Sequence, residues 1–209
     1  MALIDENTKK EVEKKLKEMK EPVKLLYFDK KTEVSEQIKE LLSEVAGLSE
    51  KLELEVDEVG SEKAKEHNIE NGPVILVKSE HVKGDARYYG IPSGYEFGPF
   101  LEIIKMASSE IKLSGDAKTF FDSNDVKLEV FVTPTCPHCP TSAYVAMKFA
   151  MGSEKVKGYV YEAMEFPDIA KKYKVMGVPK TVINEGKGEY VGGYPEDVAF
   201  VNIRKQLTE

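Results

Sequence analysis

The spacing of apolar residues predicts an alternation of helices and strands along the first half of the chain. Val12, Leu16 and Met19 share one face of a helix, and residues 52–59 alternate between apolar and polar as in a half-buried strand. Gly47 stands where the C-terminal cap of a helix is expected. The expected elements are a helix at 8–20, a strand at 23–28, a helix at 33–46, a strand at 52–59, a short helix at 61–68, strands at 71–79 and 86–90, and a helix at 93–109.

The second half repeats this order of elements. The expected elements are a helix at 115–124, a strand at 126–132, a helix that starts within the cysteine motif and runs to about 150, a strand at 157–164, a helix at 167–175, strands at 179–184 and 188–193, and a helix at 195–207. Matching landmarks in the two halves recur at nearly constant distances, which supports an internal repeat. The pairs are Thr32 and Cys136, Ser35 and Cys139, Pro73 and Pro179, and Gly90 and Gly192, which are 104, 104, 106 and 102 positions apart. Chance recurrence of common strand–helix pairs is the alternative.

We therefore expect an α/β protein built from two tandem units, each with a central mixed β-sheet flanked by helices. The N-terminal unit covers residues 1–112 and the C-terminal unit covers residues 113–209. A strand–helix–strand start makes the first strand pairing of each unit parallel. The two closing strands of each unit are separated by a short polar turn, so they should form an antiparallel hairpin.

Composition and charge exclude several classes of function. With 30 basic and 37 acidic residues the net charge is −7, which argues against a nucleic-acid surface. No apolar run approaches the roughly 20 residues that a membrane span needs, so we expect no membrane association. Residues 1–19 lack the apolar region of a secretory signal, which favours a cytoplasmic protein. Abundant lysine and glutamate, with only two arginines and two glutamines, favour a thermophilic source.

Both cysteines of the chain, Cys136 and Cys139, lie in the stretch FVTPTCPHCP. A close pair in the cytosol is more often catalytic or metal-binding than a structural staple. A zinc site needs two further soft or imidazole ligands, and His67 and His81 are in the other unit without ligand spacing, although a metal shared between two chains stays open. A disulfide that closes so short a loop adds little stability. The pair in this strand–helix context therefore favours redox chemistry, with no metal and no bound cofactor.

The residues around the pair indicate how it could react. A strand ends at Thr133 and a helix begins just past Cys136, with Pro137 suited to the first helical position. The Cys136 sulfur would then lie near free N–H groups and the positive end of the helix dipole, which lowers its pKa below the usual value of about 8.5. We expect Cys136 to attack a substrate disulfide and the more shielded Cys139 to resolve the mixed disulfide.

His138, between the two cysteines, has two interpretations. As an imidazolium it would favour the Cys136 thiolate and so stabilise the reduced form. Alternatively, it is a solvent-facing residue of the first helical turn. Pro140 is expected to cost this helix its first backbone hydrogen bond and to shape the turn.

With the strand, the Cys136-Pro137-His138-Cys139 motif and the later GVPKTV in place, the second half resembles thioredoxin and glutaredoxin domains. The tandem arrangement resembles the thermophilic protein disulfide oxidoreductases, which are related in plan to protein disulfide isomerase. This resemblance covers nearly the whole chain and implies two thioredoxin-fold units. It also implies that Pro179 is a cis proline lying against the reactive sulfur, and that the backbone of Val178 pairs with the substrate chain.

The chain departs from the family pattern in two places. Many tandem members carry a cysteine pair in both units, whereas Thr32 and Ser35 stand there in the first unit. Hydroxyls cannot replace thiolates in exchange, so the first unit should be redox-inactive and serve substrate binding, packing or reductase docking; Thr32 is a good helix N-cap. The second departure is Val130, where thioredoxin has a buried acid. The adjoining Glu129 should point the other way and be exposed, without a role in proton transfer.

The sequence therefore predicts an enzyme that reduces, forms or isomerises protein disulfides. Its substrates would be disulfide-containing or unfolded proteins, recognised by an apolar rim for which Pro134, Met176, Val178 and Tyr194 are candidates. The resemblance suggests a thioredoxin-reductase-like flavoprotein or a small dithiol as the electron partner. A redox-inert peptide-binding module or holdase is the alternative, and a thiol peroxidase is a third possibility.

Overall fold

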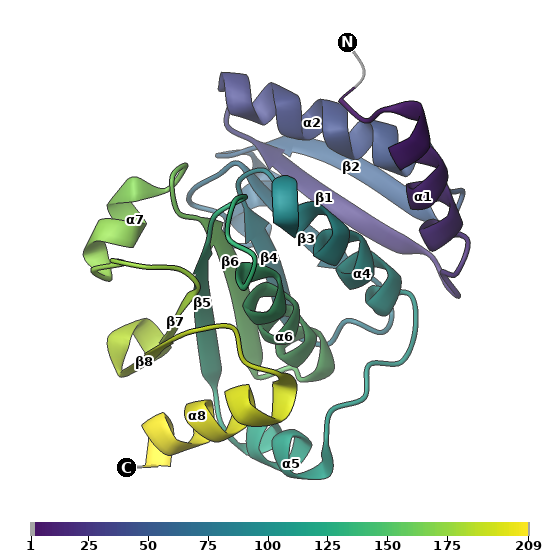
Figure 1. The fold of residues 1–209 in the computed structure, drawn as a ribbon. Coiled ribbons are helices and arrows are strands. Elements are labelled where there is room, and N and C mark those ends of the chain that lie inside the picture. Colours follow the sequence, from purple (N-terminus) through teal and green to yellow (C-terminus); the bar gives the residue numbers. More distant parts are fainter. Residues whose placement is uncertain (1–2, 209) are drawn as a thin grey trace.

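The computed structural model describes residues 3–208, in which helices and strands alternate as the apolar pattern predicts (Figure 1). The strands are β1 (Val23–Asp29), β2 (Leu52–Glu58), β3 (Val74–Lys78), β4 (Asp85–Tyr89), β5 (Val126–Val132), β6 (Val156–Glu162), β7 (Lys180–Ile183) and β8 (Gly188–Val191). The helices are α1 (Glu6–Leu16), α2 (Glu33–Ala46), α3 (Glu62–Glu66), α4 (Phe97–Ala107), α5 (Gly115–Ser123), α6 (Cys139–Gly152), α7 (Pro167–Lys172) and α8 (Glu196–Thr208), with short 3₁₀ turns η1 (Gly94–Glu96) and η2 (Asn184–Gly186).

Both halves use the same strand order. The first half is arranged β2-β1-β3-β4 and the second β6-β5-β7-β8. In each half the first two strands pair parallel, and the other neighbours pair antiparallel and close with a hairpin. The α/β fold class, the parallel start and the closing hairpins are thus confirmed.

The two groups of strands join into one eight-stranded sheet within the described residues, because β4 pairs parallel with β6. Each of these strands is the edge of its own group, so the pairing satisfies backbone groups that an isolated unit would leave open. The spacing of apolar residues along the chain does not predict this junction. Both β4 and β6 would show the same spacing if they were unpaired edge strands.

Buried side chains hold the β4–β6 junction together. The hydroxyl of Tyr159 donates to Asp85 at 2.7 Å, and Asp85 also pairs with the buried guanidinium of Arg87 at 2.6 Å. That guanidinium lies 4.7 Å from the centre of the Tyr159 ring, and the rings of Tyr89 and Tyr161 stack at 4.4 Å. The two halves therefore meet through a packed, hydrogen-bonded contact rather than through a linker alone.

The sheet is covered by helices on both faces. Helices α1, α2, α4, α5, α6 and α8 contribute to the larger core on one face (Figure 1), and α3 and α7 contribute to the smaller core on the other. In the larger core α4 packs against α6, so a helix of the first half supports the helix that starts at Cys139. No helix within residues 3–208 is long and apolar enough to cross a membrane.

Several expected helices are shorter in the structure, among them the helix expected at 8–20, which ends at Leu16. The helix expected at 93–109 is divided into η1 and α4. The helix expected at 167–175 ends at Lys172, because Lys174 has a φ of 51° and the N–H of Val175 bonds back to the carbonyl of Ala170 at 2.9 Å. This left-handed residue is the usual way for a chain to leave a helix.

Candidate active site

Cys136 and Cys139 form a disulfide at the end of the sheet where β5 leads into α6. Cys136 is 9% exposed and Cys139 is fully buried against the larger core. Cys139 is thus the more shielded of the two cysteines, as expected.

The helix after the disulfide begins later than the sequence indicated. Helix α6 starts at Cys139 with His138 as its N-cap, and Pro137 lies in the preceding turn, so the placement of Pro137 at the first helical position was wrong. The cause is a turn in which the N–H of Cys136 donates to the carbonyl of Thr133 at 3.2 Å. Pro140 instead occupies the first helical turn, where a missing N–H costs no hydrogen bond, so the expectation that it costs this helix its first backbone hydrogen bond was wrong.

Backbone groups of α6 and of the loop before β7 surround the outer sulfur. The N–H of Cys139 donates to the Sγ of Cys136 at 3.1 Å, and the carbonyl oxygen of Val178 lies 3.7 Å from the same sulfur. The Val178–Pro179 peptide bond is cis, and Pro179 is buried. A donor at a helix N-terminus favours negative charge on this sulfur, which is the condition for a reactive thiolate.

The loop between β8 and α8 closes another side of the site. The hydroxyl of Ser142 on α6 donates to the carbonyl of Gly192 at 3.2 Å. A Cβ on Gly193 would collide with the backbone carbonyl of His138, so only glycine allows this close approach. Gly193 is a site residue that the sequence analysis did not single out.

The remaining predicted residues are spread around this centre. His138 and Pro137 are exposed, and Met176 is 95% exposed beyond Val178. Tyr194 is half-buried against the larger core, and its ring lies 5.9 Å from that of Tyr190.

Pro134 connects the site to the first half of the chain. Its carbonyl accepts the N–H of Tyr95 at 2.9 Å. Gly94 has a φ of 58°, and a Cβ there would collide with the same carbonyl. The η1 turn of the first half is therefore positioned directly against the loop that precedes Cys136.

That turn carries a buried acid that the sequence analysis missed. Glu96 is 1% exposed, and neither of its carboxyl oxygens has a hydrogen-bond partner among the described residues. Burial raises the pKa of Glu96 to about 7, and the nearby hydroxyl of Tyr88, which makes no regular hydrogen bond with it, lowers it only partly. A signal existed in the sequence, because Glu96 stands four residues before Phe100 on the apolar stripe of α4.

Two further acids lie at the same junction of the halves. Glu162 ends β6 opposite Val132, and Glu165 accepts the N–H of Ile91 at 2.9 Å. Burial raises the pKa of both carboxyls. Glu96 and Glu162 are buried and Glu165 is half-buried, and burial together with the negative charge of all three acids raises the pKa of the buried Tyr88 hydroxyl.

Glu129 is buried, so the expectation that it is exposed was wrong. Its carboxylate accepts the hydroxyl of Tyr173 at 2.8 Å and pairs with Lys127 at 3.1 Å. Glu129 points to the face of the sheet that α7 and the following Tyr173 cover. A strand position expected to face solvent is therefore buried. Its neighbour Val130 is buried in the core on the α6 side, so the alternation itself is as expected.

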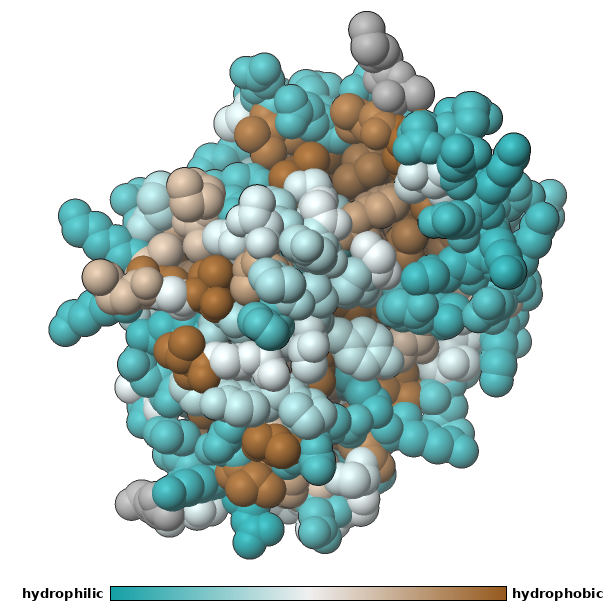
Figure 2. All heavy atoms as spheres, in the orientation of Figure 1, coloured by the Kyte–Doolittle hydropathy of each residue, from teal (hydrophilic) through white to brown (hydrophobic). Residues whose placement is uncertain are grey.

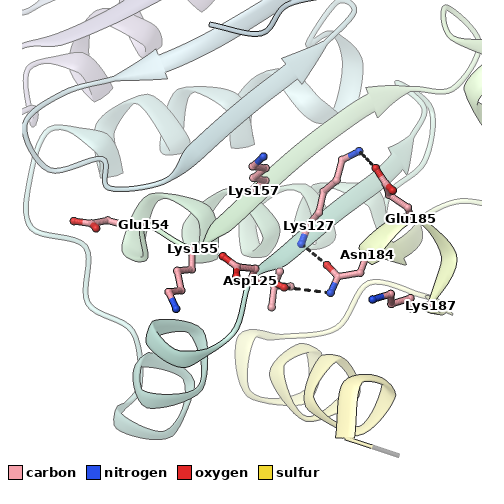
Figure 3. Close-up of a pocket in the computed structure, with 9 residues that line it drawn as sticks. Asp125, Lys127, Glu154, Lys155, Lys157, Asn184, Glu185 and Lys187 are labelled. Atoms are coloured by element: carbon pink, nitrogen blue, oxygen red, sulfur yellow. Dashed lines mark hydrogen bonds and ion pairs between the residues drawn. The ribbon is translucent and has the colours of Figure 1, made fainter.

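A hollow of about 460 Å³ opens at the other end of the sheet, where β5 and β6 begin (Figure 3). Lysines and acids line it together, with Lys127 pairing with Glu185 at 3.5 Å. The seven residues of β5 separate it from the disulfide, about 20 Å away. Within residues 3–208, no three His, Cys, Asp or Glu side chains come together as a metal site.

Comparison with known proteins relates the half of the chain that carries the disulfide to thioredoxins. The family described as "Thioredoxin domain" matches residues 126–205. A thioredoxin from Methanocaldococcus jannaschii is 36% identical over 83 residues, which cover 39% of this chain and 96% of the relative. A component of the alkyl hydroperoxide reductase of Escherichia coli is 23% identical over 187 residues, and this chain spans only 34% of its length.

Solved structures extend the similarity over both halves. A protein disulfide oxidoreductase from Aeropyrum pernix matches with a TM-score of 0.85 and 29% identity, covering 96% of this chain and 92% of the other. The corresponding component of the alkylhydroperoxide reductase of Enterococcus faecalis matches with a TM-score of 0.83 and 23% identity, covering 96% and 99%. At 23% identity, the match to the Enterococcus faecalis protein shows similarity of fold alone. Both matched structures extend over the two halves of this chain.

Proposed function

Because this chain belongs to the thioredoxin family, we propose that it is an enzyme that reduces, forms or isomerises protein disulfides by dithiol exchange. The observation that carries the proposal is the disulfide of Cys136 and Cys139 at the start of α6, with its outer sulfur beside a helical N–H and the carbonyl of Val178. A thiolate at this position is stabilised by the donor and by the helix dipole.

Exchange proceeds in two steps. In the reducing direction, the Cys136 thiolate attacks one sulfur of the substrate disulfide; a protein–substrate disulfide forms, and the other substrate sulfur leaves as a thiolate that takes up a proton. Cys139 then loses its proton and attacks the Sγ of Cys136, which re-forms the protein disulfide and releases the second substrate thiolate. The substrate gains two electrons, which the protein pair loses; in reverse, the protein oxidises a substrate dithiol.

The buried Cys139 needs a proton acceptor in the second step, and we assign this role to Glu96. Its pKa of about 7 matches a group that exchanges protons near neutral pH. Glu96 belongs to η1, which packs against α6, the helix that carries Cys139. The carboxylate comes from the other half of the chain, since Val130 provides no acid beneath the cysteines.

The other predicted residues have supporting roles in this proposal. The carbonyl of Val178 is available to accept an N–H of the substrate chain, and Pro179 forms the wall against which that chain lies. His138 is exposed at the N-cap, where an imidazolium would favour the Cys136 thiolate. Pro137 shapes the turn between the two sulfurs.

We also propose that the chain divides into a unit at 1–112 and a unit at 113–209, each with a thioredoxin fold. The repeated strand order supports this division. The first unit carries Thr32 and Ser35 instead of cysteines, so it has no redox pair, and its contribution is Glu96 and the packing of α4 on α6.

The proposed substrates are disulfide-containing or unfolded proteins. A thioredoxin-reductase-like flavoprotein or a small dithiol would return electrons to the pair, and the similarity to a component of an alkyl hydroperoxide reductase supports a partnership with other redox proteins. The lysine- and glutamate-rich composition supports a thermophilic source, and the cytoplasm is the proposed setting.

Equilibration of the protein across a series of glutathione ratios tests the proposal. After acid quenching and alkylation, mass spectrometry counts the free thiols at Cys136 and Cys139. We expect one two-electron transition; a potential near about −270 mV would indicate a reductase, and one near about −180 mV an oxidase or isomerase. The absence of any transition, with both thiols alkylating slowly, would contradict the redox function and leave the redox-inert peptide-binding module.

A further inference from the structure

A groove of about 590 Å³ runs from the disulfide along α7. Thr133 and Val178 line its inner end. The carbonyl of Thr133 accepts the N–H of Cys136 at 3.2 Å, and the carbonyl of Val178 lies 3.7 Å from the Cys136 sulfur. A chain bound in this groove would therefore reach the sulfur that we propose as the attacking group.

The lining of the groove is mainly apolar and unusually exposed. Met164 and Met176 are 78% and 95% exposed, and Pro167 and Ala170 of α7 lie between them in the chain. Figure 2 shows apolar surface over α7 and the segment that follows it, on the left of the view. Methionine side chains are flexible and polarizable, and they are common where a surface binds apolar residues of varied shape.

Two lysines give the groove its charge. Among the described residues that line it, Lys171 and Lys174 are the charged ones, and both side chains are exposed. Neither lysine has an ion-pair partner within residues 3–208. The groove is thus locally positive on a chain whose net charge is −7.

We propose that this surface, which we name the α7 groove, binds the segment of a protein substrate next to its reactive cysteine and prefers an apolar residue followed by acidic residues. The apolar residue packs between the methionines, and the carboxylates pair with Lys171 and Lys174. The inference rests on the proposed dithiol exchange and adds the class of substrate that it favours.

Four cysteine peptides, each a mixed disulfide with thionitrobenzoate, test the groove. Each peptide carries one leucine followed by two aspartates or by two lysines, placed either before or after its cysteine. Attack by the Cys136 thiolate of the reduced protein on the peptide sulfur releases coloured thionitrobenzoate, so the rise of its absorbance in a single turnover gives the second-order rate constant for each peptide. We expect one aspartate peptide to react about fivefold faster than its lysine counterpart, with the preference falling as salt is added.

A double variant, Lys171→Gln with Lys174→Asn, should abolish the preference for aspartate. Asparagine is chosen because Lys174 has a φ of 51°, which asparagine tolerates. The matched control is Lys155→Gln with Lys157→Gln, two exposed lysines in the hollow at the opposite end of the sheet (Figure 3). The control removes the same two charges and should retain the preference.

The outcomes separate the two proposals. If the wild-type protein releases thionitrobenzoate from all four peptides at equal rates, dithiol exchange stands and the α7 groove is refuted. The groove is also refuted if the preference survives in the Lys171/Lys174 variant, or if it disappears in the Lys155/Lys157 control. If the reduced protein releases none from any peptide, the exchange activity itself is refuted, and the inference falls with it.

Discussion

In the first half of the chain β1 leads to Thr32 and Ser35, and in the second half β5 leads to Cys136 and Cys139. One backbone donor is shared by the two places: the N–H of Ser35 donates to the side chain of Thr32 at 3.2 Å, and the N–H of Cys139 donates to that of Cys136 at 3.1 Å, although α2 begins directly after Thr32 and α6 begins only at Cys139. The two hydroxyls then share a hydrogen bond of 2.8 Å, whereas the two sulfurs share a covalent bond. In both halves a backbone N–H at the start of a helix donates to a side-chain atom. Whether that atom is oxygen or sulfur decides whether the pair can exchange electrons.

The halves also differ beneath these turns. The fifth residue of β1 is Tyr27, whose hydroxyl donates to the carbonyl of Ser35 at 2.8 Å, and the fifth residue of β5 is the apolar Val130. The first half thus holds its turn with a hydrogen bond from β1 that β5 cannot supply at the matching position, so the two units are not interchangeable halves.

Among the changes that test the difference between the halves, replacing the sulfur of Cys136 should have the largest effect on activity. Cys136→Ser makes the second half resemble the first, and we expect the rate of insulin-disulfide reduction to fall about a thousandfold or more, because a hydroxyl forms no nucleophilic anion near neutral pH. Cys139→Ser should instead trap a protein–substrate disulfide that mass spectrometry detects. Normal insulin reduction by the Cys136 variant would refute dithiol exchange and support the holdase.

The matched control lies in the first half. Thr32→Ala with Ser35→Ala removes the hydroxyls at the corresponding positions and should leave insulin reduction unchanged, since these residues do not exchange electrons. A fall comparable to that of Cys136→Ser would show that the first turn takes part in the reaction.

Glu96→Gln tests whether the halves cooperate in proton transfer. We expect resolution of the mixed disulfide by Cys139 to slow about a hundredfold and to lose its rise in rate through pH 7, because the variant has no carboxylate to accept the proton. Release of substrate from the mixed disulfide in a single turnover, with Cys139 intact and measured between pH 5 and pH 9, gives the profile. An unchanged profile would exclude Glu96 from the proton path.

The same variant should change how stability depends on pH. Burial raises the pKa of Glu96 from 4.5 to about 7, so between these values the folded protein binds more protons than the unfolded chain. The contribution to the free energy of unfolding is fully present below pH 4.5 and is lost as pH rises through 7, a loss of about 3 kcal/mol. Urea unfolding at pH 5 and pH 8 should show this difference in the wild type and a smaller one in Glu96→Gln, with Glu162 and Glu165 leaving a residual slope.

The smallest effect is expected from restoring sulfur to the first half. Thr32→Cys with Ser35→Cys should form a second disulfide and add a second two-electron transition in the glutathione series, because the two side chains already touch. Loss of the α2 cap should lower the free energy of unfolding of the reduced variant by about 1 kcal/mol. Two new thiols that never pair would mean that the first turn differs from the second in more than its side chains.

Patterns within a few residues of each other predicted much of this molecule. The apolar period located the helices and strands, and the cap at Thr32 was confirmed, because both depend on neighbouring residues. The start of α6 was misplaced, since the chain contains two prolines, Pro137 and Pro140, that suit a first helical turn equally well. Only the turn that ties Cys136 to Thr133 selects the second of them.

Local sequence patterns could not predict the interactions between segments that are distant in the chain. Glu129 is the fourth residue of β5, and the fourth residue of β1 is Leu26; nothing local indicates that Tyr173, 44 positions away, will cover the acid and donate to it. Glu96 gave a weak signal as a charge on an apolar stripe, but its place beside α6 depends on how α4 packs.

The sequence by itself determined the repeated order of elements and the position of the single cysteine pair at the start of a helix, because periodicity, capping and turn formation act over a few residues. The tertiary structure decided that β4 and β6 join the halves into one sheet, and that η1, with its buried Glu96, lies against the loop before Cys136 and donates the N–H of Tyr95 to Pro134. Such pairings are set by the burial of surfaces far apart in the chain, where any edge strand or apolar stripe could have found another partner.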